Sequence, residues 1–211
     1  MNLGIDGRVI TWHIGSGLAT YTNNLLENLN KLKHLRNIFL FYPYKDGTDY
    51  FEINDIPKNL LIGERRLDFW RNVYELKWDV NYPIDVFHNT VNGIGLPNCL
   101  KGVKVITLHD LIPYIMPETV DRPHLDYTLK YTPYILEDVS HIITVSHHSK
   151  SDIQRYFGID DEKITVTHLA ADPIFKPLDR DNAKKVIFNK YGVDKKYVLY
   201  LGGFSLRKNI A

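Results

Sequence analysis

The sequence has little cysteine, little net charge and no long apolar run. It holds a single cysteine, Cys99, and its 26 Lys and Arg residues against 25 Asp and Glu residues leave a formal net charge of +1. One cysteine cannot form an internal disulfide, and a nearly neutral chain has no overall field that gathers nucleic acid or anionic lipid. No apolar run approaches the roughly 20 residues that a membrane-spanning helix needs. We therefore do not expect a disulfide-stapled domain, a nucleic-acid-binding protein or a membrane-spanning protein.

The first residues, Met1 to Asp6, also lack the basic and then apolar layout of a secretory signal. Together with the single cysteine, this favours a reducing cytoplasm as the location. Peripheral contact with the inner face of a membrane stays open.

Short apolar runs alternate with amphipathic stretches along most of the chain, which is typical of an α/β fold. Several of the runs are apolar without alternation, as in parallel strands whose two faces are both covered by helices. The expected strands are Leu3–Asp6, Ile38–Tyr42, Leu60–Ile62, Asp85–His88, Val103–Leu108, Ile142–Val145 and Ile164–Thr167. We predict a mostly parallel sheet with helices on both faces.

Helices are predicted from apolar residues at three- and four-residue steps. The clearest one covers Leu18–Leu32. A second is expected around Leu125–Leu136, with a kink at Pro133, because proline removes a backbone donor. A third, short helix follows Ser146 and ends at Gly158.

The character of the chain changes after residue 167. The segment 168–181 contains two prolines and little apolar periodicity, so we interpret it as an interdomain linker. A helix over Ala183–Tyr191 and a strand over Tyr197–Leu201 are expected to follow. We predict a first domain over 1–167 and, over 182–211, the start of a second domain that continues beyond the chain.

A small-residue turn, Gly15-Ser16-Gly17, lies between the first strand and the first helix. Backbone N–H groups and the positive end of a helix can approach an anion at such a turn. The spacing differs from the six-residue dinucleotide-binding motif, and glycine turns also serve only to let a strand meet a helix. Both interpretations stay open at this point.

A second candidate site, His109-Asp110, directly follows an apolar strand. Open α/β sheets bind their ligands at the carboxyl ends of strands. A histidine can donate or accept near neutral pH, and the adjacent carboxylate can hold its ring or the local loop. The alternative is a helix-capping aspartate beside a hydrogen-bonded histidine.

The pair Arg207 and Lys208 follows a glycine turn, where two cations can hold a diphosphate. Solvated surface cations are the alternative. The stretch from Arg65 to Trp78 mixes cations with large aromatics and admits acceptor sugars, lipid headgroups or the edge of a core helix as partners. The remaining histidines lack metal-ligand spacing, so we expect no structural zinc site.

Taken in order, these motifs resemble the retaining glycosyltransferases of family four, which have the GT-B architecture. The resemblance rests on Ile5-Asp6-Gly7-Arg8, Gly15 to Thr22, Leu108 to Pro113, Ile142 to Ser146, Asp172 to Pro177, and Gly202 to Asn209. It covers essentially the whole chain and implies a Rossmann-like first domain. In that family a second such domain faces the first, and the reaction takes place in the cleft.

The resemblance also implies roles for single residues. Gly15, Ser16 and Gly17 would border the diphosphate of the donor. His109 would contact the transferred sugar and aid the reacting centre, and Asp110 would orient the loop of that histidine.

The implied role of Arg207 and Lys208 is to neutralise the diphosphate leaving group. Breaking the anomeric bond leaves negative charge on phosphate, which fixed cations and helix N–H groups stabilise. The nucleotide sugar is then a co-substrate, and no cofactor or metal is expected. We predict that this cation pair, the glycine turn and His109 converge on one crevice.

The resemblance implies a hexosyltransferase that transfers a sugar, with mannose favoured, from a nucleotide-diphospho-sugar to a saccharide or glycolipid acceptor. The family's paired-glutamate motif is expected beyond Ala211, so the 211-residue chain alone is expected to have negligible transfer activity. The alternative is a noncatalytic nucleotide- or sugar-binding module of the same fold. A transport-type sugar-binding protein is disfavoured because an export signal would normally accompany it.

Overall fold

The computed structural model describes residues 1–12, 15–33, 35–43, 58–61, 83–97 and 100–210. The chain divides into two compact units, Met1–His168 and Leu169–Ala211, which are described separately below. Cys99 and the aromatic and basic stretch from residue 65 to 78 lie outside the described residues. The prediction of a first domain over 1–167, a linker over 168–181 and a second domain from 182 stays a prediction.

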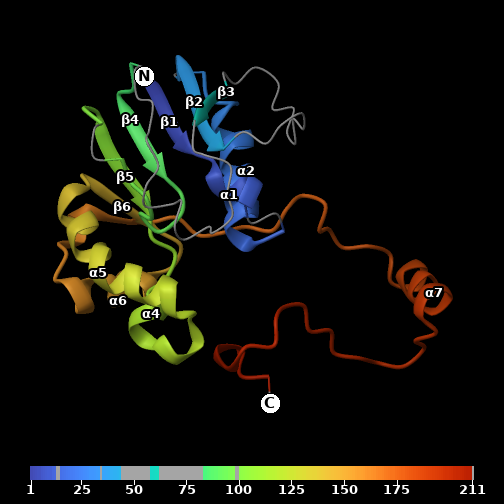
Figure 1. Ribbon diagram of the computed structural model, residues 1–211. Coiled ribbons are helices and arrows are strands. Elements are labelled where there is room, and N and C mark those ends of the chain that lie inside the picture. Colours follow the sequence, from blue (N-terminus) through green and yellow to red (C-terminus); the bar gives the residue numbers. More distant parts are fainter. Residues whose placement is uncertain (13–14, 34, 44–57, 62–82, 98–99, 211) are drawn as a thin grey trace. The chain divides into compact units, whose positions relative to one another are not determined.

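The first unit is built on one sheet of seven parallel strands in the order β3-β2-β1-β4-β5-β6-β7. The strands are β1 (Asn2–Asp6), β2 (Asn37–Pro43), β3 (Lys58–Leu61), β4 (Val86–Asn89), β5 (Val103–Thr107), β6 (His141–Thr144) and β7 (Ile164–Val166). All seven expected strands are present within a few residues of their expected bounds, although Ile62 lies outside the described residues. The α/β, Rossmann-like, mostly parallel fold is confirmed (Figure 1).

Helices follow several strands of this unit. They are α1 (Arg8–Trp12), α2 (Gly17–Leu29), α4 (Ile112–Ile115), α5 (Arg122–Asp138) and α6 (His147–Phe157), with short 3₁₀ turns η1 (Pro117–Thr119) and η2 (Asp161–Lys163). Side-chain caps start the longer helices, since Ser16 Oγ accepts from the amide of Ala19 and Ser146 Oγ accepts from the amide of Ser149. Each of these bonds satisfies a backbone donor that the first turn of a helix leaves unpaired.

The ends of the expected helices differ in detail from the sequence-based expectation. Helix α2 ends at Leu29 rather than at Leu32, which is 42% exposed and outside the helix. Helix α5 continues through Pro133, and α6 ends at Gly158, whose φ of 65° is left-handed. Glycine adopts that conformation without the steric cost that a Cβ would bring.

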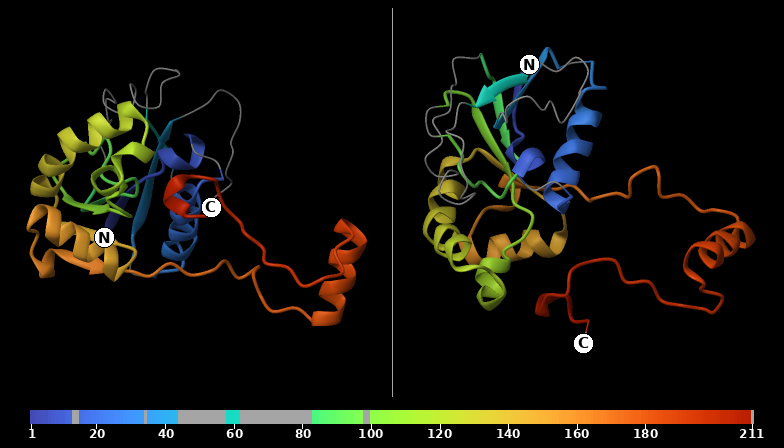
Figure 2. Two further views of the ribbon diagram at one scale, coloured as in Figure 1. Left: turned by 90° about the horizontal axis from the view of Figure 1, so that it is seen from below. Right: turned by 45° about the vertical axis from the view of Figure 1, so that its right-hand side comes forward.

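The two faces of the sheet bury separate sets of side chains. Because side chains alternate along a strand, Leu3 and Ile5 of β1 share a face with Ile38 and Leu40 of β2, and α2 packs there with Leu26. The opposite face carries Phe41 and Phe87, and farther along the sheet Ile106, Ile142 and Ile164. Figure 2 shows α2 and α5 on opposite sides of the sheet.

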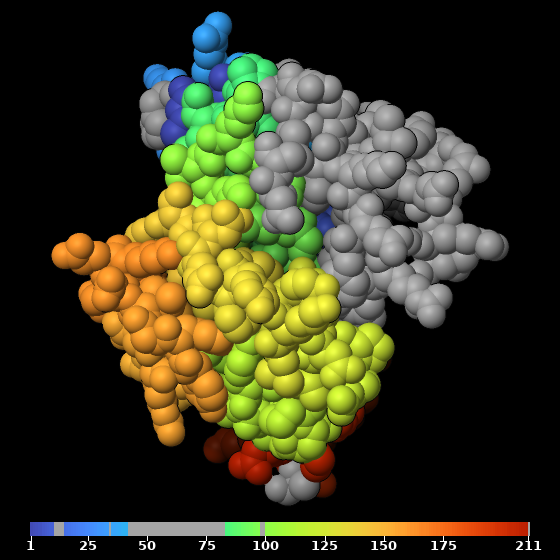
Figure 3. All heavy atoms as spheres, turned by 60° about the vertical axis from the view of Figure 1, so that its left-hand side comes forward, coloured from blue at the N-terminus to red at the C-terminus, as the bar shows by residue number. Residues whose placement is uncertain are grey.

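The second face is covered by α5 and α6. Leu136 of α5 and Ile153 of α6 are almost fully buried against Ile142 of β6. Figure 3 shows this side in space-filling form, with α5 in yellow beside α6 and β7 in orange. Helices on both faces leave only the edges and the strand ends of the sheet for ligands.

The second unit contains one longer helix, α7 (Arg180–Tyr191), and the 3₁₀ turn η3 (Leu206–Lys208). Helix α7 begins three residues before the expected Ala183 and ends at Gly192, whose φ is 68°. The expected strand over Tyr197–Leu201 is wrong, because these residues are not in a strand and Val198 is 99% exposed. A strand needs a neighbour to satisfy its backbone groups, and the described residues of this unit contain no strand that could be one.

Candidate functional site

The candidate site lies at the carboxyl edge of the sheet. The strand order runs from β1 to β2 and β3 on one side and from β4 to β7 on the other, so the direction of winding reverses between β1 and β4. Ligands of open α/β sheets bind outside the strand ends at such a point. The glycine turn follows β1 through the short α1, and His109 follows β5, next to β4.

Four contacts from three parts of the fold fix His109 in position. Its backbone N–H donates to Asn92 Oδ1 over 2.8 Å, and its ring Nε2 lies 3.1 Å from the carbonyl oxygen of Thr90. Its own carbonyl oxygen accepts from Ser149 Oγ over 2.9 Å. The ring of Tyr21 meets the imidazole edge to face, with the centroids 4.8 Å apart. The imidazole is therefore oriented before any ligand arrives.

The bond to Thr90 also assigns the tautomer of His109. A carbonyl oxygen only accepts, so Nε2 must carry the proton, which leaves Nδ1 as an acceptor in the neutral ring. Burial lowers the pKa of His109, while the bond to the Thr90 carbonyl and the charge of Asp110 act in the opposite direction. The neutral ring can accept a hydrogen bond at Nδ1 from a hydroxyl group, such as that of a sugar.

Asp110 shapes the chain beyond His109. Its Oδ1 accepts from the amide of Ile112 over 3.0 Å, at the start of α4. The carboxylate thus holds the local turn by a hydrogen bond to the backbone. The implied role of Asp110 at the catalytic site, to orient the loop of His109, stays a prediction.

The glycine turn leaves the start of α2 open. Gly15 has a φ of 82° and is exposed, and a Cβ built on Gly15 or on Gly17 would meet nothing within 4 Å. Ser16 caps the helix by accepting from the amide of Ala19, and the first N–H groups of a helix have no partner within the helix itself. Tyr21, one turn into α2, contacts the ring of His109, so the helix and the imidazole belong to one site. Anion binding at this turn stays a prediction.

A buried hydrogen-bonded chain lies beneath Tyr21. The hydroxyl of Tyr21 is 3.0 Å from Thr107 Oγ1, which is 2.7 Å from Nε2 of His88. Burial, and then the charge of His109, lower the pKa of His88 to about 4. Burial also raises the pKa of Tyr21, against the effect of its bond to Thr107. His88 is thus neutral and hydrogen-bonded near pH 7, and it fixes Tyr21 through Thr107.

The remaining site candidates, Arg207 and Lys208, lie in η3 of the second unit and are exposed. They follow Gly202 and Gly203 in sequence, as expected, but no strand precedes them. Their convergence with His109 and the glycine turn stays a prediction. Among the residues that the structure describes, no group of three or more His, Cys, Asp or Glu side chains is arranged to hold a metal ion.

Comparison with known sequences decides the family. The sequence model of Glycosyltransferase Family 4 matches residues 15–174, a stretch that includes the glycine turn and His109. The chain belongs to glycosyltransferase family 4. Over 214 aligned residues, this family-4 chain is also 30% identical to the O-antigen chain mannosyltransferase B of Escherichia coli.

That alignment covers 92% of this chain but 54% of the Escherichia coli protein. The family-4 chain thus spans about half the length of the curated relative that it matches. Within the described ranges, none of its helices is both long and apolar enough to cross a membrane.

Several residues of the candidate site were not singled out from the sequence. Thr90 and Asn92 hold His109, and Tyr21 packs on it. The dipeptide Asn92-Gly93 is a common turn signal that could have indicated this loop, in which both residues have positive φ. The link between Thr90 and the imidazole has no signal in sequence, because a backbone carbonyl carries no side-chain identity.

Proposed function

We propose that the full-length protein is a retaining hexosyltransferase of the glycosyl-transferring class. It transfers a hexose from a nucleotide-diphospho-sugar to a saccharide or glycolipid acceptor. Mannose is the first candidate because the relative from Escherichia coli is named an O-antigen chain mannosyltransferase. A polysaccharide or glycolipid product and a cytoplasmic location, with contact at the inner face of the membrane, belong to the same proposal.

The observation that carries the proposal is the placement of His109. The imidazole contacts Tyr21, one turn into α2, and lies at the carboxyl edge of the sheet with Nδ1 as its acceptor. A sugar hydroxyl can donate to Nδ1 while the diphosphate of the same donor lies at the helix start. One nucleotide sugar then contacts both groups, as a transferase site requires.

The charge that develops during sugar transfer fits the groups of the proposed site. As the anomeric bond breaks, the diphosphate gains negative charge and the sugar gains positive character, and fixed dipoles and cations stabilise that separation. In the proposal, N–H groups at the glycine turn act on the diphosphate together with Arg207 and Lys208 from the second unit. These cations take the place that a metal ion has in other transferases, so the reaction needs no metal cofactor.

The test is sugar transfer by the full-length protein and by its His109→Ala variant. Loss of the imidazole removes a contact to the transferred sugar, and we expect kcat to fall by about 10²-fold or more. His148→Ala is the matched control, because His148 is 88% exposed in α6 and is not one of the residues that contact His109. Transfer by the His109→Ala variant at the parent rate would exclude the role of the histidine. Donor binding without transfer in the parent protein would favour a noncatalytic module.

A further inference from the structure

A buried ion pair lies at the point where the winding of the sheet reverses. Asp6 ends β1, and Arg8 follows it after Gly7; the two side chains are 0% and 2% exposed. Arg8 Nε donates to Asp6 Oδ1 over 2.8 Å, and Arg8 Nη2 donates to Asp6 Oδ2. These residues belong to the first of the motifs on which the family resemblance rests, Ile5 to Arg8, and the proposed reaction uses neither of them.

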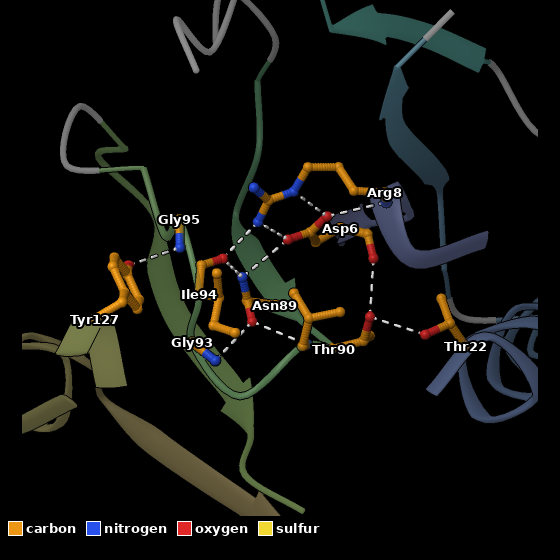
Figure 4. A network of polar contacts seen from close by, with 10 residues as sticks. Asp6, Arg8, Thr22, Asn89, Thr90, Gly93, Ile94, Gly95 and Tyr127 are labelled. Carbon is orange, nitrogen blue, oxygen red and sulfur yellow. Dashed lines mark hydrogen bonds and ion pairs between the residues drawn. The ribbon is translucent and has the colours of Figure 1, made fainter. Parts of the chain in front are cut away.

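The ion pair binds the loop that follows β4. Arg8 Nη2 donates to the carbonyl oxygen of Ile94, and Asn89 Nδ2 donates to Asp6 Oδ2 over 2.9 Å and to the same Ile94 oxygen over 3.0 Å. The hydroxyl of Thr90 donates to the backbone oxygen of Asp6. Figure 4 shows these groups converging on Asp6 and Arg8 from β1, β4 and the loop.

The loop turns through three left-handed residues. Asn92, Gly93 and Gly95 have φ values of 57°, 74° and 64°. Glycine adopts this conformation freely, whereas a non-glycine residue such as Asn92 adopts it at a cost that its surroundings must offset. Asn89 Oδ1 accepts from the amides of Val91 and Gly93, so the residue that bonds to Asp6 also folds the loop.

The same loop orients His109. Its two acceptors, the carbonyl oxygen of Thr90 and the side-chain oxygen of Asn92, bind the ring and the backbone of the histidine. We infer that the Asp6–Arg8 ion pair positions His109, by holding the loop from Thr90 to Leu96 in the conformation that presents these two acceptors. Asp6, Arg8 and Asn89 are positioning residues in this assignment, and none of them contacts the sugar. The effect on transfer rests on the proposed function; the effect on the imidazole does not.

Stability alone is a poor explanation for the pair. Burying two charges removes their hydration, and replacing a whole buried ion pair with apolar residues is often neutral or stabilising. Removing one partner instead leaves an unpaired buried charge and damages the fold. The informative change is therefore the double variant Asp6→Leu/Arg8→Met, which removes both charges together.

A second ion pair of the unit provides the matched control. Lys104 Nζ lies 2.6 Å from Asp138 Oδ2, with side chains 10% and 45% exposed. Lys104 is at the start of β5, whereas His109 follows its other end. The variant Lys104→Met/Asp138→Leu makes the same chemical change away from the loop.

Two measurements on the full-length protein test the inference. Nitrogen NMR of the histidine rings reports which nitrogen of His109 carries the proton, with the signal assigned by its loss in His109→Gln. We expect the parent and the control to show the Nε2–H form, and the Asp6→Leu/Arg8→Met variant to show a mixture of both neutral forms. In transfer assays we expect kcat of this double variant to fall by about 10²-fold, with the KM for the donor changing less. The reason is that the misplaced imidazole of His109 acts on the reacting centre.

Arg8→Lys is the variant to use if the double variant unfolds, because it keeps a positive charge beside Asp6. A lysine ammonium lacks the planar fork that bonds Asp6 and Ile94 together. We expect a smaller shift of the His109 signals than in the double variant and a partial loss of kcat. Unchanged His109 signals in a folded variant of either kind would overturn the inference. Shifted signals in a protein whose parent shows no transfer would uphold the positioning role and reject the proposed function instead.

Discussion

The buried histidine of β4 makes the stability of the protein depend on pH. His88 is 6% exposed, its Nε2 bonds to Thr107 Oγ1, and burial lowers its pKa from 6.5 to about 4. Between these two values the unfolded chain binds a proton that the folded chain does not. The free energy of unfolding therefore falls as the pH drops from 6.5 towards 4.

The size of the effect follows from the two pKa values of His88. A shift of one pKa unit corresponds to about 1.36 kcal/mol, so the full loss is about 3 kcal/mol. Most of this loss falls between pH 7 and pH 4.5, where it amounts to roughly 2 to 3 kcal/mol. Glutamine does not titrate, and its amide can still bond to Thr107, so His88→Gln removes this loss.

The assay is urea unfolding of the parent and of His88→Gln at pH 7 and at pH 4.5. Titrating groups other than His109, whose charge acts on His88, contribute equally to both proteins, so the difference reports mainly on His88. We expect the decrease in unfolding free energy between the two pH values to be roughly 2 to 3 kcal/mol smaller in the variant. His148→Gln, a change at an exposed histidine, serves as the control. Equal decreases in the parent and in His88→Gln would refute the reasoning.

Two further predictions concern the loop and the absence of a metal. Gly93 has a φ of 74°, and a Cβ added there would lie only 2.6 Å from Ile135 Cγ2, whereas Gly158 has a similar φ and open space around its position. We therefore expect Gly93→Ala to lower the free energy of unfolding in urea by at least about 1 kcal/mol more than Gly158→Ala. Equal losses in the two variants would contradict the close contact. Because cations rather than a metal are proposed to stabilise the leaving diphosphate, we expect transfer by the full-length protein to survive dialysis against EDTA at its original rate, and loss of activity that Mg²⁺ or Mn²⁺ restores would reject that proposal.

The sheet could be predicted from the sequence because each strand carries its own signal. Buried parallel strands are short apolar runs, and all seven were placed within a few residues. Capping residues such as Ser146 and Gly158 likewise act locally and marked the ends of α6. The strand over Tyr197–Leu201 was wrong because an apolar run forms a strand only beside a partner, and its own unit supplies none among the described residues.

The arrangement of the site was only partly predictable. His109 was identified from its position after an apolar strand, but its supports come from residues distant in sequence. Asn89 lies 83 positions from Asp6, and Ile94 lies 86 positions from Arg8. Such contacts depend on the strand order, which places β1 beside β4, and no local pattern encodes that order. The role of the Asp6–Arg8 pair therefore emerged only from the structure.

The most direct test of the central claim is the identity of the products that the full-length protein forms. Proton NMR during incubation with GDP-mannose and a saccharide acceptor reports the released nucleotide and the anomeric configuration of the new linkage together. We predict GDP release coupled to a product with the same anomeric configuration as the donor, with both signals growing about 10²-fold more slowly or not at all in His109→Ala. A product of inverted configuration, or equal product formation without the imidazole, would contradict the account.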